Sequence, residues 1–315
     1  MDWLFLAIGL VILVAAGEAT VRGAVGLARK MDISPAVIGA IVIGFGTSAP
    51  ELVVSIQAAL LGQPDLAIGN IVGSNISNLL LILGAGALIH RLGADRQCYW
   101  RDGGMMLLSA MALTCIALWG VIERWQGLLL VAALLGYIAW SLRSDNGNAA
   151  GGDAVDALEQ APDRWPVILP MILAGLAGLI GGAHLLVEGA VGIARNFGVP
   201  ESIIGLTIVA VGTSLPELAA TITAALRRQT DLALGNIFGS CSFNVLSILG
   251  ITAIIQPLPF APDIAGIDIW VMLAATLAVF GLMAGQHCLT RWKGGLLLLG
   301  YIGYMVHIAD RLGTV

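Results

Sequence analysis

The sequence predicts an all-α membrane protein of ten transmembrane helices, built as two inverted five-helix repeats with the N-terminus and C-terminus outside. Three observations predict this fold class. Of the 315 residues, 58% are hydrophobic and 11% are charged, and the mean hydropathy is +0.93, whereas about a quarter of the residues of a soluble domain are charged. Ten apolar segments are long enough to cross a bilayer. A long segment of the first half recurs 166 residues later.

The apolar segments define the helices in order. The chain begins MDWLFLAIGL, without a positively charged stretch, so the first segment is expected to be a retained span and not a cleaved signal. The polar segment Arg143–Trp165 is expected to be a cytoplasmic linker between a first repeat (1–142) and a second repeat (166–315). The expected helices cover residues 3–28, 36–60, 66–89, 103–121, 125–142, 166–194, 202–226, 232–255, 266–286 and 294–310.

The positive charges of the loops predict the orientation. With the N-terminus outside, eleven Lys and Arg residues fall in cytoplasmic loops, and three fall in outside loops or the tail. This bias agrees with the positive-inside rule. The three outside residues are Arg124, Arg195 and Arg311.

The repeat has a geometric consequence. Its two copies are GFGTSAPELVVS…DLAIGNIVGSNISNLLLILG and AVGTSLPELAAT…DLALGNIFGSCSFNVLSILG. Five spans separate equivalent elements, and five is odd, so the copies cross the membrane in opposite directions. An inverted repeat relates equivalent residues by a pseudo-two-fold axis in the membrane plane. Glu51 and Glu217 are therefore expected to meet near the midplane.

The second span and its copy carry a broken turn beside a carboxylate. Pro50 cannot donate a hydrogen bond to the carbonyl of Gly46, so the helix is expected to break there and to free backbone carbonyls. Glu51 lies four residues after Thr47, on the same helix face. The same turn recurs at Thr213, Pro216 and Glu217. Ionisable residues inside membrane spans usually mark an ion path.

The third span and its copy carry a polar stripe. Asn70, Ser74 and Asn78 follow one another at four-residue spacing, and Asn236, Ser240 and Asn244 match them. Part of such a stripe can simply join helices. That alternative stays open for Asn70 and Asn236, while Asn78 and Asn244 are the better candidate ligands.

The chemistry of these groups narrows the ligand. Carboxylate, amide, hydroxyl and carbonyl oxygens suit Ca²⁺, Mg²⁺, Mn²⁺ and Na⁺ and not Zn²⁺ or Cu⁺. Two glutamates with several neutral oxygens fit the flexible coordination of Ca²⁺ best.

The four cysteines form no CxxC pair and are expected to be reduced; they are Cys98, Cys115, Cys241 and Cys288.

With its two GTS-x-PE…GN-x-x-GS-x-x-x-N blocks, the chain resembles the sodium/calcium exchanger family of the calcium/cation antiporters, especially its short prokaryotic members. The resemblance implies ten helices, an ion-binding core made of spans 2, 3, 7 and 8, and alternating access by sliding of spans 1 and 6. It also implies a ligand set of Glu51, Glu217, Thr47, Thr213, Ser48, Ser214, Ser74, Ser240, Asn78 and Asn244. Exchangers of this family commonly have an aspartate at one of the two asparagine positions, so this core holds two acids where three are common.

The expected function is secondary antiport of Ca²⁺ against Na⁺. The alternative is antiport of H⁺ against Ca²⁺ or another divalent cation, and a passive cation channel is a different class. The chain is expected not to be an enzyme and to use no cofactor. Its sequence contains no Walker motif, so transport driven by ATP is not expected. The expected partners are the lipid bilayer and the transported ions. No basic stripe suggests nucleic acid, and no obligate protein partner is evident. The expected location is a bacterial inner membrane.

Other ionisable residues in the spans receive a structural interpretation. Asp65 and Asp231 open the third and eighth spans, where a carboxylate complements the helix N-terminus. Capping is their expected role, and an ion-entry vestibule is the alternative. A structural or interfacial role, with gating of the sliding helices as the alternative, is expected for four residues inside the first and sixth spans: Glu18, Arg22, His184 and Glu188.

Overall fold

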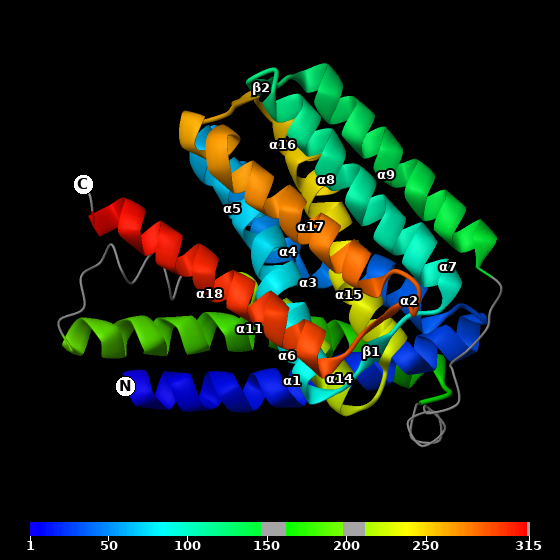
Figure 1. Ribbon diagram of the computed structural model, residues 1–315. Coiled ribbons are helices and arrows are strands. Elements are labelled where there is room, and N and C mark those ends of the chain that lie inside the picture. Colours follow the sequence, from blue (N-terminus) through cyan, green and yellow to red (C-terminus); the bar gives the residue numbers. More distant parts are fainter. Residues whose placement is uncertain (146–161, 198–211, 314–315) are drawn as a thin grey trace.

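The structure is a computed structural model, which describes residues 1–145, 162–197 and 212–313. Helices dominate these residues (Figure 1). The first half contains α1 (Asp2–Met31), α2 (Pro35–Ile38), η1 (Gly39–Ile43), α3 (Gly44–Thr47), α4 (Ala49–Leu60), α5 (Pro64–Ile76), η2 (Ser77–Ile82), α6 (Leu83–Ile89), β1 (Leu92–Gly93), α7 (Arg96–Cys98), η3 (Tyr99–Gly103), α8 (Gly104–Ala117), β2 (Val121–Ile122) and α9 (Arg124–Ser144). The second contains α11 (Trp165–Asn196), α14 (Leu215–Leu226), α15 (Thr230–Phe243), η5 (Asn244–Leu249), α16 (Gly250–Ile255), β3 (Leu258–Pro259), η6 (Ile264–Asp268), α17 (Ile269–Met283), β4 (Cys288–Leu289) and α18 (Arg291–Gly313). The η elements are π-helical turns that continue the neighbouring α-helices.

The mostly helical, membrane-type character is confirmed, while the number of ten spans stays a prediction. Six helices of the described residues are long and apolar enough to cross a bilayer, and the bent pair 35–47 and 49–60 would make a seventh. The expected linker lies mostly outside the described residues, and so do residues 202–211 of the expected seventh span. Two expected spans end early: the fourth at Ala117 and the ninth at Met283. Gly120 and Gly285, which adopt positive φ after these ends, let the chain turn there.

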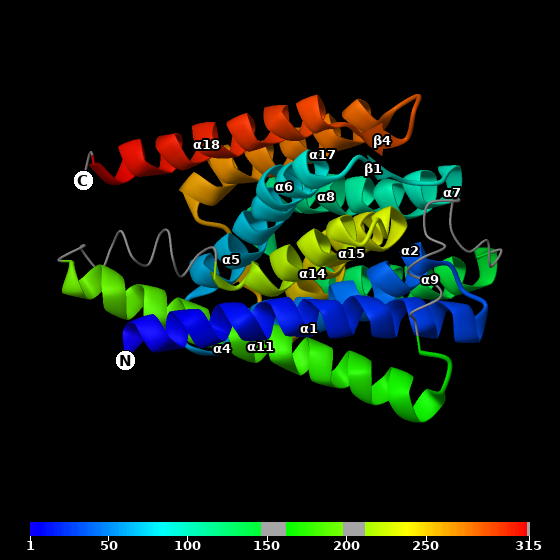
Figure 2. The same cartoon turned by 90° about the horizontal axis from the view of Figure 1, so that it is seen from below.

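Helices α1 and α11 lie side by side and run in opposite directions (Figures 1 and 2). Glycines bring the two backbones together. A Cβ on Gly189 would lie 2.5 Å from the nitrogen of Leu6, and one on Gly175 would lie 2.4 Å from the hydroxyl of Thr20. Early residues of α1 therefore meet late residues of α11, as expected for equivalent helices of opposite direction.

Two short strand pairs repeat the same relation at two places in the molecule. Leu92 and Gly93 of β1 pair with β4, and Leu258 and Pro259 of β3 pair with β2. Strand β3 stands 166 residues after β1, so β1 and β3 are equivalent, and each of them pairs with a non-equivalent strand of the other half. The two strand pairs are therefore equivalent to each other. In Figure 1, β1 and β2 lie at opposite ends of the helices. This placement agrees with the inverted relation of the two copies.

The helices that hold the site are packed at backbone distance. Helix α15 runs along α2 and η1, and the glycines of α15 face that contact. A Cβ on Gly235 would lie 2.2 Å from the carbonyl oxygen of Ala36, and one on Gly239 would lie 2.4 Å from that of Ala40. Because backbone atoms line this contact, no flexible side chain can move aside.

We expect Gly235→Ala to destabilise the protein. Overpacking of this kind costs about 1–3 kcal/mol, so the melting temperature of the detergent-solubilised protein should fall by several degrees. The matched control is Gly136→Ala, because a Cβ at Gly136 of α9 meets no atom of the described residues within 4 Å. The control should keep or raise the melting temperature, since alanine favours helix over glycine. Equal behaviour of the two variants would contradict the close contact.

One end of the molecule carries an ionic network that the expected span boundaries do not include. Arg101 and Asp102 are buried in η3 and form an ion pair with an Nε–Oδ1 distance of 2.7 Å. Tyr137 of α9 donates its hydroxyl to Asp102 at 2.9 Å. Arg101 is one of the eleven positive residues expected in cytoplasmic loops, but its charge is compensated inside the helix bundle.

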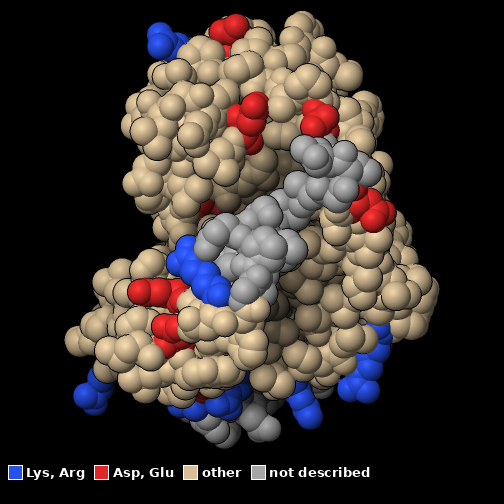
Figure 3. Space-filling model, turned by 90° about the vertical axis from the view of Figure 1, so that its left-hand side faces the viewer, with Lys and Arg blue, Asp and Glu red and all other residues tan. Residues whose placement is uncertain are grey.

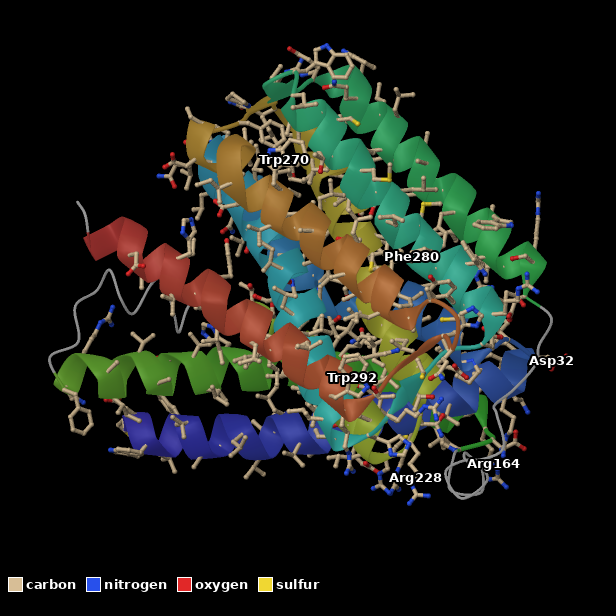
Figure 4. All side chains as sticks on the ribbon, in the orientation of Figure 1. Asp32, Arg164, Arg228, Trp270, Phe280 and Trp292 are labelled. Atoms are coloured by element: carbon tan, nitrogen blue, oxygen red, sulfur yellow. The ribbon has the colours of Figure 1, made fainter. Side chains whose placement is uncertain are left out.

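The charged surface is sparse. On the side that faces left in Figure 1, most of the surface consists of uncharged residues, with scattered acidic and basic side chains (Figure 3). Arg164 and Arg228, which belong to two expected cytoplasmic loops, lie at the same end of the molecule, and Trp270 lies toward the other end (Figure 4).

A candidate cation site between the two halves

Two broken helices bring a carboxylate into the interior from each half. Helices α3 and α4 meet at Ser48 with a bend of 44°, which confirms the predicted break beside Pro50. The equivalent Ser214 precedes α14 with nearly the same backbone angles, φ −88° and ψ 4°. Glu51 and Glu217 lie in the first turns of α4 and α14 and are each 1% exposed. The positive end of a helix dipole favours carboxylates at these positions.

Each carboxylate is approached by hydroxyl groups of the opposite half. Ser48 donates its hydroxyl to Oε1 of Glu217 at 3.0 Å, and the Thr47 side chain also faces that carboxylate. Thr213 faces Glu51. The two carboxylates are close enough to repel each other. The site is therefore shared between the halves.

The polar stripe contributes two kinds of residue. Asn70 donates its side-chain nitrogen to the hydroxyl of Ser55 at 3.2 Å, and Asn236 does the same to Thr221 at 2.9 Å. These bonds join α5 to α4 and α15 to α14, so the packing interpretation left open for the outer asparagines has structural support.

The inner asparagines lie deeper and at a change of helix type. Asn78 and Asn244 are buried in the first turns of η2 and η5, which occupy equivalent places in the two halves. Single π-helical turns inside α-helices are frequent at functional sites.

The centre of the site is rich in unpartnered polar atoms. Within the described part of the chain, both carboxylate oxygens of Glu51 and both amide atoms of Asn78 lack a hydrogen-bond partner. Single atoms without one belong to Glu217, Thr213, Ser214, Asn236 and Asn244. Since buried polar groups are normally satisfied, this concentration of free oxygens fits a cation that supplies the missing contacts.

The remaining predicted residues differ in their surroundings. Ser74 is buried and faces the Glu51 carboxylate. Its counterpart Ser240 instead donates its hydroxyl to the carbonyl of Gly44 at 3.3 Å. Among the described residues, no three His, Cys, Asp or Glu side chains gather as a metal site would require. A cation here would depend on two carboxylates and neutral oxygens.

A cavity of about 280 Å³ reaches the site from one side. It lies between α11 and the broken helices, and its polar lining includes His184 and Thr213, with Pro50, Val54, Val187 and Pro216 around them. Because Thr213 also faces Glu51, the cavity borders a residue of the candidate site.

The equivalent face on the other side of the site is packed. Gly17 of α1, the counterpart of Ala183, stands where a Cβ would lie 2.5 Å from the Thr223 hydroxyl of α14. Glu18 of α1 accepts a hydrogen bond from Nε of Arg227, at the end of α14, at 2.8 Å, and also pairs with Arg22. Glu18 and Arg22 thus form an ion pair, which agrees with a structural role for them, and the network extends to a residue of the second half. Helix α1 is thus fixed to α14, while a cavity lies beside α11.

The other expected interpretations have these outcomes. Asp65 and Asp231 lie in the first turns of α5 and α15, as predicted. His184 lines the cavity, and Glu188 is exposed. All four cysteines are free, as predicted.

Sequence reasoning missed Asn75, which contacts Asn244. The available signal was the mismatch of Asn75 with Cys241 in otherwise matching blocks.

Comparison with known proteins gives a consistent result. The model of the family described as sodium/calcium exchanger protein matches residues 1–143 and 167–309. The sodium/calcium exchanger MaX1 of Methanosarcina acetivorans is 30% identical, with 97% of this chain and 98% of the relative covered. The inner membrane protein YrbG of Escherichia coli is 32% identical, with 96% and 94% covered. A solved structure of the sodium-calcium exchanger NCX_Mj, soaked with zero Na⁺ and Ca²⁺, superposes with a TM-score of 0.85 at 29% identity and covers 97% of this chain and 98% of its own.

Proposed function

Because the chain belongs to the sodium/calcium exchanger protein family, whose members are transporters and not enzymes, we propose that it exports Ca²⁺ in exchange for Na⁺ by secondary active antiport. Both ions are cargo, bound in turn at the site between the halves. The proposed ligands are Glu51, Glu217, Thr47, Thr213, Ser48, Ser214, Ser74, Ser240, Asn78 and Asn244.

One observation carries the proposal. Two carboxylates from equivalent turns of the two halves are buried together, each approached by hydroxyls of the other half, among oxygens without partners. Uncompensated buried carboxylates are costly, and a divalent cation would compensate them charge for charge. The cavity supports the transport cycle, since it gives the site access from one side while α1 covers the other.

The proposal includes a membrane arrangement. Ten spans would form repeats at 1–142 and 166–315, joined by a cytoplasmic linker at 143–165, with both termini outside. The inner membrane is the proposed location, supported by the relative YrbG, which is named an inner membrane protein. In this orientation the cavity beside α11 opens toward the outside, and Glu18 and Arg227 lie on the cytoplasmic side.

The decisive experiment is a flux measurement with purified protein in proteoliposomes. Vesicles loaded with Na⁺ and diluted into Na⁺-free buffer should accumulate radioactive Ca²⁺, because outward Na⁺ flow drives Ca²⁺ inward. Vesicles with equal Na⁺ on both sides are the control and should show no net accumulation. Ca²⁺ uptake that ignores Na⁺ and follows a pH gradient would replace Na⁺ by H⁺ in the proposal. Large single-channel currents would instead assign a passive channel.

A further inference from the structure

The amide of Asn244 is oriented by another asparagine. Asn244 donates its side-chain nitrogen to Oδ1 of Asn75 at 2.9 Å, and Asn75 donates its own nitrogen to the backbone carbonyl of Cys241 at 3.3 Å. All three residues are at most 2% exposed. A backbone carbonyl can only accept a hydrogen bond, so Asn75 must present its nitrogen to Cys241 and its oxygen to Asn244.

This chain of bonds fixes which end of Asn244 is available to a ligand. The nitrogen of Asn244 is occupied by Asn75, and its oxygen Oδ1 is the atom without a partner among the described residues. The free end of this amide is therefore an oxygen, which is the atom that a cation needs.

The equivalent contact in the other half lacks the orienting residue. The repeat offset places Cys241 at the position of Asn75 and Asn78 at the position of Asn244. Asn78 lies beside the Cys241 thiol, yet in the part of the chain that the structure describes neither of its amide atoms has a hydrogen-bond partner. A thiol is a weak donor and a weak acceptor, so it does not select one orientation of the amide.

We propose that Asn75 is a positioning residue that holds the Asn244 oxygen toward the transported cation, and that Cys241 leaves the amide of Asn78 free to turn. This inference rests on the proposed function, since it assigns unequal roles to two proposed ligands. Asn244 is then a fixed ligand and Asn78 an adaptable one. A site that binds either one divalent ion or several monovalent ions needs ligands that can rearrange, and Asn78 provides that freedom.

The alternative is that Asn75 only joins α5 to α15. Exchange of the two side chains separates these roles. Asn75→Cys should free Asn244 and weaken Ca²⁺ binding by about tenfold, the order of one hydrogen bond's contribution. Cys241→Asn should orient Asn78, tighten Ca²⁺ binding by severalfold and lower turnover, because release becomes slower. The double variant Asn75→Cys/Cys241→Asn moves the fixed ligand to the other half and should restore the Kd of the wild type.

The measurement is the Ca²⁺ Kd of each purified variant by calorimetry, with its melting temperature and the KM and maximal rate of Ca²⁺ flux. Asn196→Cys is the matched control, because Asn196 bonds Asp2 at an exposed place on α11, and its Kd should equal that of the wild type. If Asn75→Cys lowers the melting temperature and leaves the Kd unchanged, Asn75 is a packing residue and the inference fails. If Asn75→Cys does not fold, an unchanged Kd for Cys241→Asn overturns it as well. A wild-type protein that binds no Ca²⁺ would instead overturn the proposed function.

Discussion

Glu51→Gln and Glu217→Gln should each reduce Na⁺-driven Ca²⁺ transport by at least about 100-fold. Each substitution keeps the shape of the side chain but removes one of the two charges that compensate the cation. Removal of one partner of a buried charge pair costs about 3–5 kcal/mol, which corresponds to a factor of 100 or more. The initial rate of radioactive Ca²⁺ uptake into proteoliposomes, at equal protein incorporation, measures the effect.

The control for this pair is a carboxylate outside the site. Asp65→Asn makes the same chemical change on the exposed first turn of α5 and should keep uptake near the wild-type rate. Melting temperatures should show that all three variants fold. Wild-type uptake in both glutamate variants would exclude Glu51 and Glu217 as ligands.

The exchange should be electrically neutral in the wild type and become electrogenic when a third carboxylate is added. Two carboxylates balance one Ca²⁺ or two monovalent ions, and a third monovalent ion would leave an uncompensated charge in a low-dielectric site. Asn244→Asp supplies a third negative charge and should favour a third Na⁺. Each cycle would then move one net charge.

A membrane potential distinguishes the two cases. A potential of about 100 mV changes the free energy of moving one net charge across the membrane by about 2.3 kcal/mol. This changes the final ratio of Ca²⁺ inside the vesicles to Ca²⁺ outside about 50-fold. Imposed potentials should leave wild-type accumulation unchanged and shift that of Asn244→Asp. Because an aspartate at 244 loses its bond to Asn75, Asn78→Asp is the companion variant, which adds the charge where no bond is broken. Wild-type flux that responds to voltage as one net charge would overturn the neutral stoichiometry.

The parts of the site that could be predicted from the sequence are those fixed by local rules. A proline beside a glutamate in an apolar segment predicts a helix break with a buried carboxylate, and the structure has that break at Ser48. The constant repeat offset also predicts which residues are equivalent. These statements need no knowledge of how the halves dock.

The parts that could not be predicted depend on docking or on competing partners. The bond from Ser48 to Glu217 joins residues 169 positions apart and exists only because α3 lies against α14. Ser240 matches Ser74 in sequence, yet its hydroxyl is used by the Gly44 carbonyl. The burial of Arg101 could not be foreseen either, because it depends on the adjacent Asp102 and on Tyr137 of another helix.

The attachment of α1 to α14 through Glu18 and Arg227 affects the relative stability of the two states that open to opposite sides of the membrane. If each half adopted the conformation that the other half has here, the same fold would open to the opposite side of the membrane. In that state α11 would dock where α1 docks now, and the repeat offset would bring His184 to the place of Glu18 and Leu61 to that of Arg227. A histidine and a leucine cannot replace the carboxylate–guanidinium contact.

The two halves are therefore equivalent in fold, but the two oppositely open states differ in free energy. An exposed ion pair contributes up to about 1 kcal/mol, enough for about a fivefold preference between two states. In the proposed orientation, the protein without bound cargo would spend most of the time with its cytoplasmic side closed and its outer side accessible. An exporter at rest in this way presents its empty site to Na⁺ outside the cell, where the driving ion is.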